Sequence, residues 1–230
     1  MLERIREAAR SGQPEEILTL VDAIGSSTLD DLVADLRPAL GTLAQQLERP
    51  LPRFVAVESS HQAPAQVRFR AEIVPALRDV FMHLLRNALD HGIEPVEERR
   101  VRGKPDAGKV TLSVRSNGHG CELRVHDDGR GLSVAALRAQ AAARALPCES
   151  DEELAQLAFQ SGISTADASR ISGRGVGLDA VRVLMAERGG KVDLELESAT
   201  DEDRRPFTAA IWLPERWIVR LRTPAEVGTA

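Results

Sequence analysis

The sequence predicts an α+β fold, a two-layer α/β sandwich in which a mixed sheet carries helices on one face and follows an N-terminal helical segment. Three observations lead to this class. Apolar residues recur at spacings of three and four in several stretches, as in helices. They alternate with polar residues in others, as in strands. The strands come in neighbouring groups without regular strand–helix–strand alternation, which disfavours a doubly wound parallel sheet.

Residues 1–50 are expected to be helical, as a linker or a dimerisation-like segment before a second domain over residues 51–230. Leu2 and Ile5 open a first short helix. Pro14 stands where a second helix begins, because the first helical turn tolerates proline, and that helix should end at Gly25. Ser27-Thr28, followed by two aspartates, is a good N-terminal cap for a third helix.

The third helix carries one apolar stripe, and Pro38 should kink it before Pro50 and Pro52 end the helical region. The stripe consists of Leu29, Leu32, Val33, Leu36, Leu40, Leu43 and Leu47. Two interpretations of the stripe stay open: packing on its own domain, and pairing with another chain in a homodimer.

After residue 52 the sequence predicts mixed strands and helices. Short strands are expected around Phe54 to Val57 and in the run QVRFR, before a long helix from about Glu72 to Asp90. The runs KVTLSVRS and CELRVHDD should form a hairpin around Asn117-Gly118. The remaining expected elements are helices over residues 134–145, 151–159 and 176–188, a helix C-cap at Gly189-Gly190, and the strands KVDLELES and PFTAAIWLP.

Composition narrows the classes of partner and the compartment. The net charge is −5 with 30 cations and 35 anions scattered along the chain, and aromatic residues make up 3%, so nucleic-acid binding is not expected. Cys121 and Cys148 have no metal-ligand or disulfide-framework spacing, which fits a reducing cytosol. No signal peptide or run of 18 apolar residues occurs, so we expect a cytoplasmic protein without direct membrane insertion.

A cluster of polar residues lies in the run HLLRNALDHG. His83, Arg86, Asn87, Asp90 and His91 are spaced by three and four residues, which would put their side chains on one face of a single helix. Such a face is either an ordinary solvated surface or a binding site, and the run alone does not distinguish them.

Three further segments have the composition of ligand-binding loops. The run DDGRG at 127–131 ends a strand, so a carboxylate is fixed where the glycine backbone can approach a ligand. The run SGRGVG at 172–177 precedes a helix, and its alternate glycines allow backbone N–H groups to face an anion. The polar loop from Gln160 to Ile171 has the character of a lid. Each segment alone is also compatible with a plain turn or surface loop.

In this order the four features resemble the ATP-binding domain of histidine kinases, in particular CheA-type chemotaxis kinases within the GHKL superfamily. The resemblance rests on HLLRNALDHGIEPVEERRVRGKP, VHDDGRGL, FQSGIST and SGRGVGLDAVRVLMAERGGKVDLE, and it covers roughly residues 50 to 215. It implies a Bergerat-type ATP-binding fold with ATP and Mg²⁺ as cofactors.

The resemblance also implies a role for each matching position. Asn87 would bind the Mg²⁺ that bridges the ATP phosphates, and His83 would orient or polarise the attacking group. Asp127 would accept a hydrogen bond from the adenine amino group and so select ATP over GTP. The other implied nucleotide-binding residues are Arg86, Asp90, His91, Gly129, Gly131, Leu132, Ser164, Thr165, Gly173, Arg174, Gly175, Val176 and Gly177.

The sequence departs from the family pattern in three respects. The stretch TDEDRRPFTAAIWLP lacks the Gly-Thr pair that usually precedes the closing strand, so the third glycine box is missing. The helix LRAQAAARAL offers Arg138 and Arg144 but no lysine as a phosphate contact. No histidine stands in a setting typical of a phosphoacceptor, so we expect a fragment of a longer kinase or a substrate histidine on another protein.

The implied function is transfer of the γ-phosphoryl group of ATP to a histidine on a separate phosphotransfer domain, which passes it to a response regulator. The alternative is a nucleotide-sensing binding module, a degenerate kinase without phosphotransfer activity. An ATPase clamp of the MutL kind is disfavoured, because such clamps use a glutamate where this chain has His83.

Overall fold

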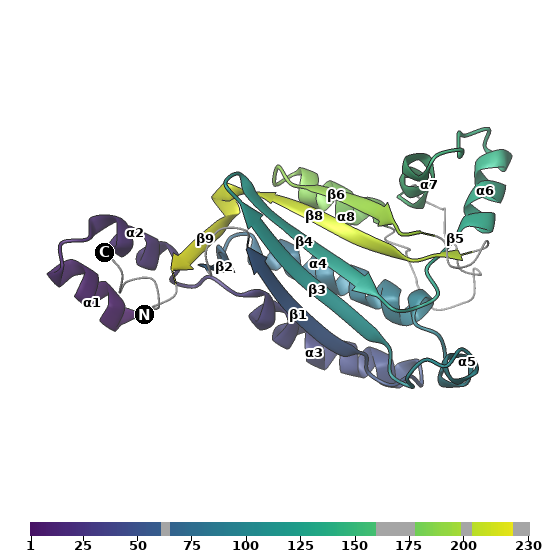
Figure 1. Ribbon diagram of the computed structural model, residues 1–230, viewed down its shortest axis with the longest axis horizontal. Helices are drawn as coiled ribbons and strands as arrows, with labels where there is room; N and C mark the ends of the chain where they lie inside the picture. The colour runs from purple at the N-terminus through teal and green to yellow at the C-terminus, as the bar shows by residue number, and fades with distance from the viewer. Residues whose placement is uncertain (61–64, 160–177, 199–203, 223–230) are drawn as a thin grey trace.

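A computed structural model describes residues 1–60, 65–159, 178–198 and 204–222. A five-stranded sheet of order β1-β3-β4-β8-β6 forms its centre (Figure 1). The strands are β1 (Arg53–Ser60), β3 (Lys109–Asn117), β4 (Gly120–Asp127), β8 (Phe207–Pro214) and β6 (Lys191–Leu196). β1 runs parallel to β3 and the other neighbours are antiparallel, so the expected mixed sheet is confirmed.

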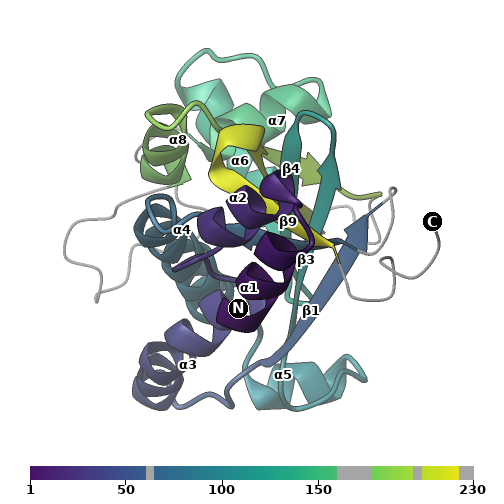
Figure 2. The ribbon, with the colours of Figure 1, turned by 90° about the vertical axis from the view of Figure 1, so that its left-hand side faces the viewer.

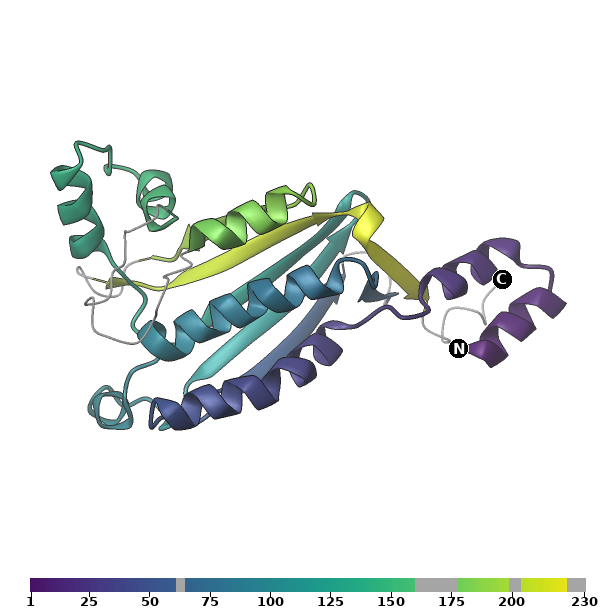
Figure 3. The same cartoon turned by 180° about the vertical axis from the view of Figure 1, so that it is seen from behind.

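One face of this sheet is covered by three helices, which lie in front of it in Figure 3. They are α3 (Leu29–Gln46), α4 (Val74–Asn87) and α8 (Leu178–Ala186). Burial alternates along β3, with Val110, Leu112 and Val114 buried and their neighbours less so, because successive side chains of a strand point to opposite faces. The predicted two-layer sandwich with helices on one face is therefore confirmed.

The helix α3 belongs to this layer. Its N-terminus has a capping box: the Asp31 amide donates to Thr28 Oγ1 (3.1 Å), and the Thr28 amide donates to Asp31 Oδ2 (2.8 Å). Its stripe lies in the same core as the sheet, so it packs on its own chain. The helix continues through Pro38; the kink expected there and the division at residue 50 stay predictions.

The expected long helix is shorter than predicted. Its regular part ends at Asn87, and a five-residue π-helical turn, η1 (Ala88–Gly92), follows. A short helix that the sequence reading did not include, α5 (Val96–Val101), comes next. The predicted hairpin is confirmed, with β3 and β4 paired from Val110 with Asp127 to Asn117 with Gly120. Gly189 has φ +70° just after α8 and serves as the expected C-cap.

The first and last elements of the described chain form a small separate group at one end of the sheet (Figures 1 and 2). It contains the helices α1 (Leu2–Arg10) and α2 (Pro14–Asp22) and a two-stranded sheet of β2 (Ala65–Phe69) and β9 (Ile218–Arg222). A separate apolar cluster holds it together, formed by Ala8, Leu20, Ala23, Val219 and Leu221.

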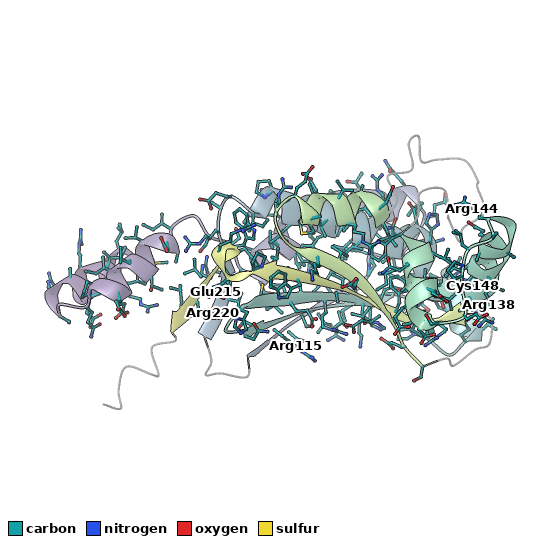
Figure 4. The ribbon with its side chains drawn as sticks, turned by 90° about the horizontal axis from the view of Figure 1, so that it is seen from above. Arg115, Arg138, Arg144, Cys148, Glu215 and Arg220 are labelled. Atoms are coloured by element: carbon teal, nitrogen blue, oxygen red, sulfur yellow. The ribbon has the colours of Figure 1, made fainter. Side chains whose placement is uncertain are left out.

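Arg220 ties β9 to the main sheet. Its guanidinium pairs with Glu215 of the 3₁₀ turn η2 (Glu215–Trp217), and Figure 4 shows the two side chains beside each other where β8 leads into β9. It also donates to the carbonyls of Asn117 and Gly120, the latter at 3.2 Å. The side chain of Arg220 therefore connects β9 to both η2 and the tip of the β3–β4 hairpin.

The opposite end of the sheet carries the helices α6 (Val134–Ala143) and α7 (Asp151–Ala158) and a pair of two-residue strands, β5 (Leu132–Ser133) and β7 (Arg204–Arg205). Arg138, Arg144 and Cys148 lie on α6 and the connection after it (Figure 4). Both cysteines of the chain are free thiols. Among the described helices, none has the length and apolar content needed to cross a membrane.

Candidate nucleotide-binding site

The polar run predicted on one helix is divided between two elements. His83, Arg86 and Asn87 lie on the last turns of α4, whereas Asp90 and His91 lie in η1. The Ile93 amide donates to the Ala88 carbonyl, five residues earlier, at 2.6 Å, and this wider turn changes the direction of the residues after Asn87. The expectation of a single regular helix was therefore wrong for Asp90 and His91, which lie in the π-helical turn.

Arg49, in the connection that follows α3, supports the turn η1. Its guanidinium donates to the carbonyls of Leu89 and Ile93, the latter at 2.7 Å. Carbonyls at the end of a helix lack a partner within the helix, so these hydrogen bonds replace missing ones. Burial, together with the nearby charge of Arg130, lowers the pKa of Arg49. The sequence reading missed this residue, because its partners lie about 40 positions away along the chain.

His83 is half-buried, and its Nε2 atom has no hydrogen-bond partner among the described residues. Burial lowers the pKa of His83, Arg86 lowers it further, and Asp179 of α8 opposes the shift. The ring is therefore neutral at neutral pH. A buried polar atom without a hydrogen-bond partner destabilises the folded state. Nε2 is therefore available to form a hydrogen bond with a bound group.

Asp127, the last residue of β4, faces the turn η1. Its Oδ1 accepts a hydrogen bond from the Gly129 amide at 3.0 Å, and a Cβ atom on Gly92 would lie 2.9 Å from the same oxygen. Only glycine leaves room for the carboxylate at position 92. Burial raises the pKa of Asp127, while the bond from Gly129 opposes the shift. The sequence reading identified Asp127 but not Gly92.

The two glycines after Asp127 allow close backbone packing. A Cβ on Gly129 would lie 2.2 Å from the Gly92 carbonyl oxygen, so this loop rests directly on η1. Gly131 has φ +71°, and a Cβ there would lie 2.2 Å from the Arg205 carbonyl oxygen of β7. Leu132 follows, buried in β5. The structure thus joins the DDGRG loop to the turn that follows Asn87.

A pocket of about 440 Å³ opens beside this loop. Its walls include Asp127, Asp128, Gly129 and Arg130, with Lys104 and Arg204 among the basic residues. The predicted site residues Ser164, Thr165, Gly173, Arg174, Gly175, Val176 and Gly177 lie outside the described residues.

The side chain of Asn87 fits the role of a magnesium ligand. It is half-buried and makes no hydrogen bond in the described part of the chain, so its amide oxygen is available. The described residues contain no group of three His, Cys, Asp or Glu side chains that could hold a metal by themselves. A single amide oxygen is compatible with Mg²⁺, which takes one or two protein ligands and completes its shell with waters and phosphate oxygens.

The comparison with known families identifies the domain. Residues 72–216 match the family model of histidine kinase-, DNA gyrase B- and HSP90-like ATPases. The chain belongs to this family. The matched range contains the end of α4, η1 and the DDGRG loop, so the contact between these motifs lies within an ATPase domain of the histidine-kinase type.

Several curated proteins are similar to this chain. It is 32% identical over 215 residues to the sensor histidine kinase CheAY of Helicobacter pylori, which covers 86% of this chain and 27% of that protein. It is 38% identical over 138 residues to the chemotaxis protein CheA of Bacillus subtilis, covering 57% of this chain and 20% of that protein. The gliding motility regulatory protein of Myxococcus xanthus is 40% identical over 123 residues, and the match covers 50% of this chain and 16% of that protein.

The chain therefore spans between 16% and 27% of the length of these relatives. Among solved structures, the mycobacterial sensor histidine kinase MprB superposes with a TM-score of 0.49 at 16% identity, covering 80% of this chain and 95% of that one.

Proposed function

We propose that this chain is the ATP-binding catalytic part of a CheA-like protein-histidine kinase, which transfers the γ-phosphoryl group of ATP to a histidine on a separate phosphotransfer domain. The observation that carries the proposal is the contact between Gly92 and the Asp127 carboxylate. The Asp127 carboxylate, which would accept a hydrogen bond from the base, lies against the turn η1, and η1 follows the α4 residues that would face the phosphates. One nucleotide can then bridge the two motifs.

Asp127 would recognise the base. Its Oδ1 is occupied by the Gly129 amide, and in the described structure Oδ2 has no hydrogen-bond partner. This oxygen is an acceptor for the exocyclic amino group of adenine. Guanine has a carbonyl oxygen at the corresponding position, which is itself an acceptor. The carboxylate would therefore select ATP over GTP.

The phosphate side would be formed by α4 and η1. Asn87 would hold Mg²⁺, which neutralises charge on the phosphate oxygens as the γ-phosphoryl group is transferred. Arg86 and His91 are exposed and would meet the phosphate charge, with Asp90 beside them. The neutral ring of His83 would orient the attacking group through Nε2. Gly131, Leu132 and the residues of 160–177 that the sequence singled out would complete the enclosure.

We also propose the wider setting expected for this function. The downstream partner would be a response regulator, and the location would be the cytoplasm, in keeping with two free thiols. Homodimerisation through the N-terminal helices is part of the same proposal, and nucleic acid is not among the proposed partners.

The alternative function is a nucleotide-sensing module without phosphotransfer. It is favoured by one feature, the missing third glycine box before β8. In its place the described residues have the short strand β7, whose Arg205 donates to the Glu197 carbonyl at 2.9 Å. Such a module would bind ATP with Mg²⁺ and leave a phosphotransfer domain unlabelled.

The test combines binding with transfer. Calorimetry should detect Mg²⁺-dependent ATP binding that Asn87→Ala abolishes and Asn117→Ala, the same change at the other end of the sheet, leaves intact. Incubation with γ-labelled ATP and a phosphotransfer domain should then give an acid-labile, base-stable label on that domain. Binding without label would support the sensing module. Absence of ATP binding by the unmodified chain would refute both functions.

A further inference from the structure

A buried ionic cluster lies behind the loop that carries Asp127. Arg99 of α5 is 0% exposed and Glu94 is 2% exposed. The half-buried side chains of Lys104 and Asp128 pair with them, and the exposed Arg102 lies 4.0 Å from Glu94. Ions are buried at a high cost unless they are paired and hydrogen-bonded, so each contact in such a cluster constrains its partners closely.

Arg99 directs most of its donors to two carboxylates. It contacts Asp128 with two nitrogens, at 3.2 Å to Oδ1 and 2.9 Å to Oδ2, and Glu94 at 2.9 Å. Its Nε donates to the Pro105 carbonyl at 2.6 Å. A bidentate guanidinium–carboxylate pair fixes orientation as well as distance. The side chain of Asp128, the residue after Asp127, is therefore held in one position.

Lys104 holds the backbone of the same loop. Its ammonium donates to the carbonyl oxygens of Asp128 (2.7 Å) and Gly129 (3.2 Å) and to Glu94 Oε1 (2.8 Å). On the other side, the Lys109 amide donates to Asp128 Oδ1 at 2.9 Å. Both the side chain and the backbone next to Asp127 are thus attached to the segment 94–109.

The charge of Asp128 depends on these contacts. Burial by itself raises the pKa of Asp128, but the hydrogen bonds from Arg99 and from the Lys109 amide lower it more, so the net shift is downward. Burial likewise acts against ionisation of Glu94, and Lys104 and Arg99 reverse the effect, so its pKa is lowered as well. Both carboxylates stay charged and keep their hold on the cations at neutral pH.

We propose that Arg99 and Lys104 are positioning residues for base recognition: they fix Asp128 and Gly129 so that the Asp127 carboxylate stays aimed at the amino group of the base. This inference rests on the proposed function and extends it to two residues that act through the loop 128–129. It explains why a charged run, VEERRVRGKP, contains a fully buried arginine. Outside the segment 94–109, the side chains of Arg99 and Lys104 form hydrogen bonds, among the described residues, to the loop 128–129.

The test compares two cluster variants with a matched control. Lys104→Met removes the contacts to the loop carbonyls, and Arg99→Lys keeps the charge but cannot form the bidentate pair. Arg100→Met is the control, because Arg100 lies next to Arg99 on α5 but pairs with Asp106 on the surface. Calorimetry measures the affinity of each variant for Mg²⁺-ATP and Mg²⁺-GTP, and thermal unfolding confirms that each is folded.

We expect each cluster variant to lose about tenfold in ATP affinity, ~1.4 kcal/mol, with little change for GTP, so that the preference for ATP falls about tenfold. Arg100→Met should leave both affinities unchanged. A general structural weakening would lower both affinities together and would overturn the inference. So would folded Lys104→Met and Arg99→Lys proteins that keep the full preference for ATP.

These outcomes separate this inference from the proposed function. If the unmodified chain binds ATP in preference to GTP and the variants do the same, the positioning role fails while the proposed function stands. If the unmodified chain binds no ATP, the proposed function fails and the positioning role fails with it.

Discussion

Replacing Asp127 by asparagine separates the electrostatic role of this side chain from its shape. The two side chains have nearly the same volume, and asparagine can still accept the hydrogen bond that Gly129 gives to Oδ1 at 3.0 Å. The difference lies at the second position, where an NH₂ donor replaces the free carboxylate oxygen. That donor would face the adenine amino group, which is also a donor, so the hydrogen bond to adenine is lost.

The size of the effect follows from the kind of bond removed. A hydrogen bond to a charged group is worth roughly 1.5–3 kcal/mol. Since about 1.4 kcal/mol is tenfold in affinity, ATP should bind Asp127→Asn about 10- to 150-fold more weakly. GTP should bind no more weakly than before, because the new amide can donate to the guanine carbonyl oxygen.

Although Asp127→Asn should bind ATP more weakly, its folded state should be more stable than that of the unmodified protein. Burial raises the pKa of Asp127 above the ordinary 3.8, so the unfolded chain gives up this proton at a lower pH than the folded chain. The carboxyl group therefore loses its stabilising effect as the pH rises above 3.8 through the folded-state pKa. Asp127→Asn should gain melting temperature relative to the unmodified protein across that range.

Calorimetric titration with ATP and GTP, followed by thermal melts as a function of pH, tests both parts. The reasoning would be refuted by a folded Asp127→Asn protein that binds ATP within twofold of the unmodified protein and keeps its preference for ATP. A melting temperature that falls relative to the unmodified protein as the pH rises would contradict the role assigned to burial.

Three further changes have defined outcomes. Because burial lowers the pKa of His83 below 6.5, the unfolded chain protonates first, so stability should fall as the pH drops below 6.5, and His83→Gln should reduce that fall in melting experiments. Gly129→Ala places a Cβ 2.2 Å from the Gly92 carbonyl oxygen and should abolish ATP binding, whereas Gly118→Ala, with no atom within 4 Å, should bind normally in calorimetry. Arg49→Met leaves turn carbonyls unpaired and should lower the free energy of unfolding by about 1–3 kcal/mol in urea titrations; no change would show that water replaces the guanidinium.

The parts of the fold that the sequence predicts are those determined by neighbours in the chain. The stripe and cap of α3 depend on spacings of three and four residues, and the β3–β4 hairpin depends on the turn at Asn117. β9 is different, because its partner β2 is about 150 positions earlier and a run of five residues carries little periodicity of its own. Pairing between strands so far apart in the chain could therefore not be predicted from the local sequence pattern.

The same distinction holds for the site. Asp127 is recognisable because a carboxylate and two glycines stand together in one turn, and the family resemblance assigns them to the adenine. The π-helical turn was not predictable from neighbouring residues, and Arg49, whose guanidinium bonds to its carbonyls, comes from the distant connection after α3. Arg99 was overlooked because arginines in charged runs are mostly exposed, and its burial depends on Asp128 from a different strand connection.

The position of β8 also has a consequence for the order in which the protein is made. β8 lies between β4 and β6, although it is the last of the five strands to leave the ribosome. In the described part of the chain β6 pairs only with β8, so a nascent chain that stops short of residue 207 has two further open strand edges, one on β4 and one on β6. The five-stranded sheet is therefore completed only after β8 has been synthesised, and chains cut before β8 should aggregate instead of folding.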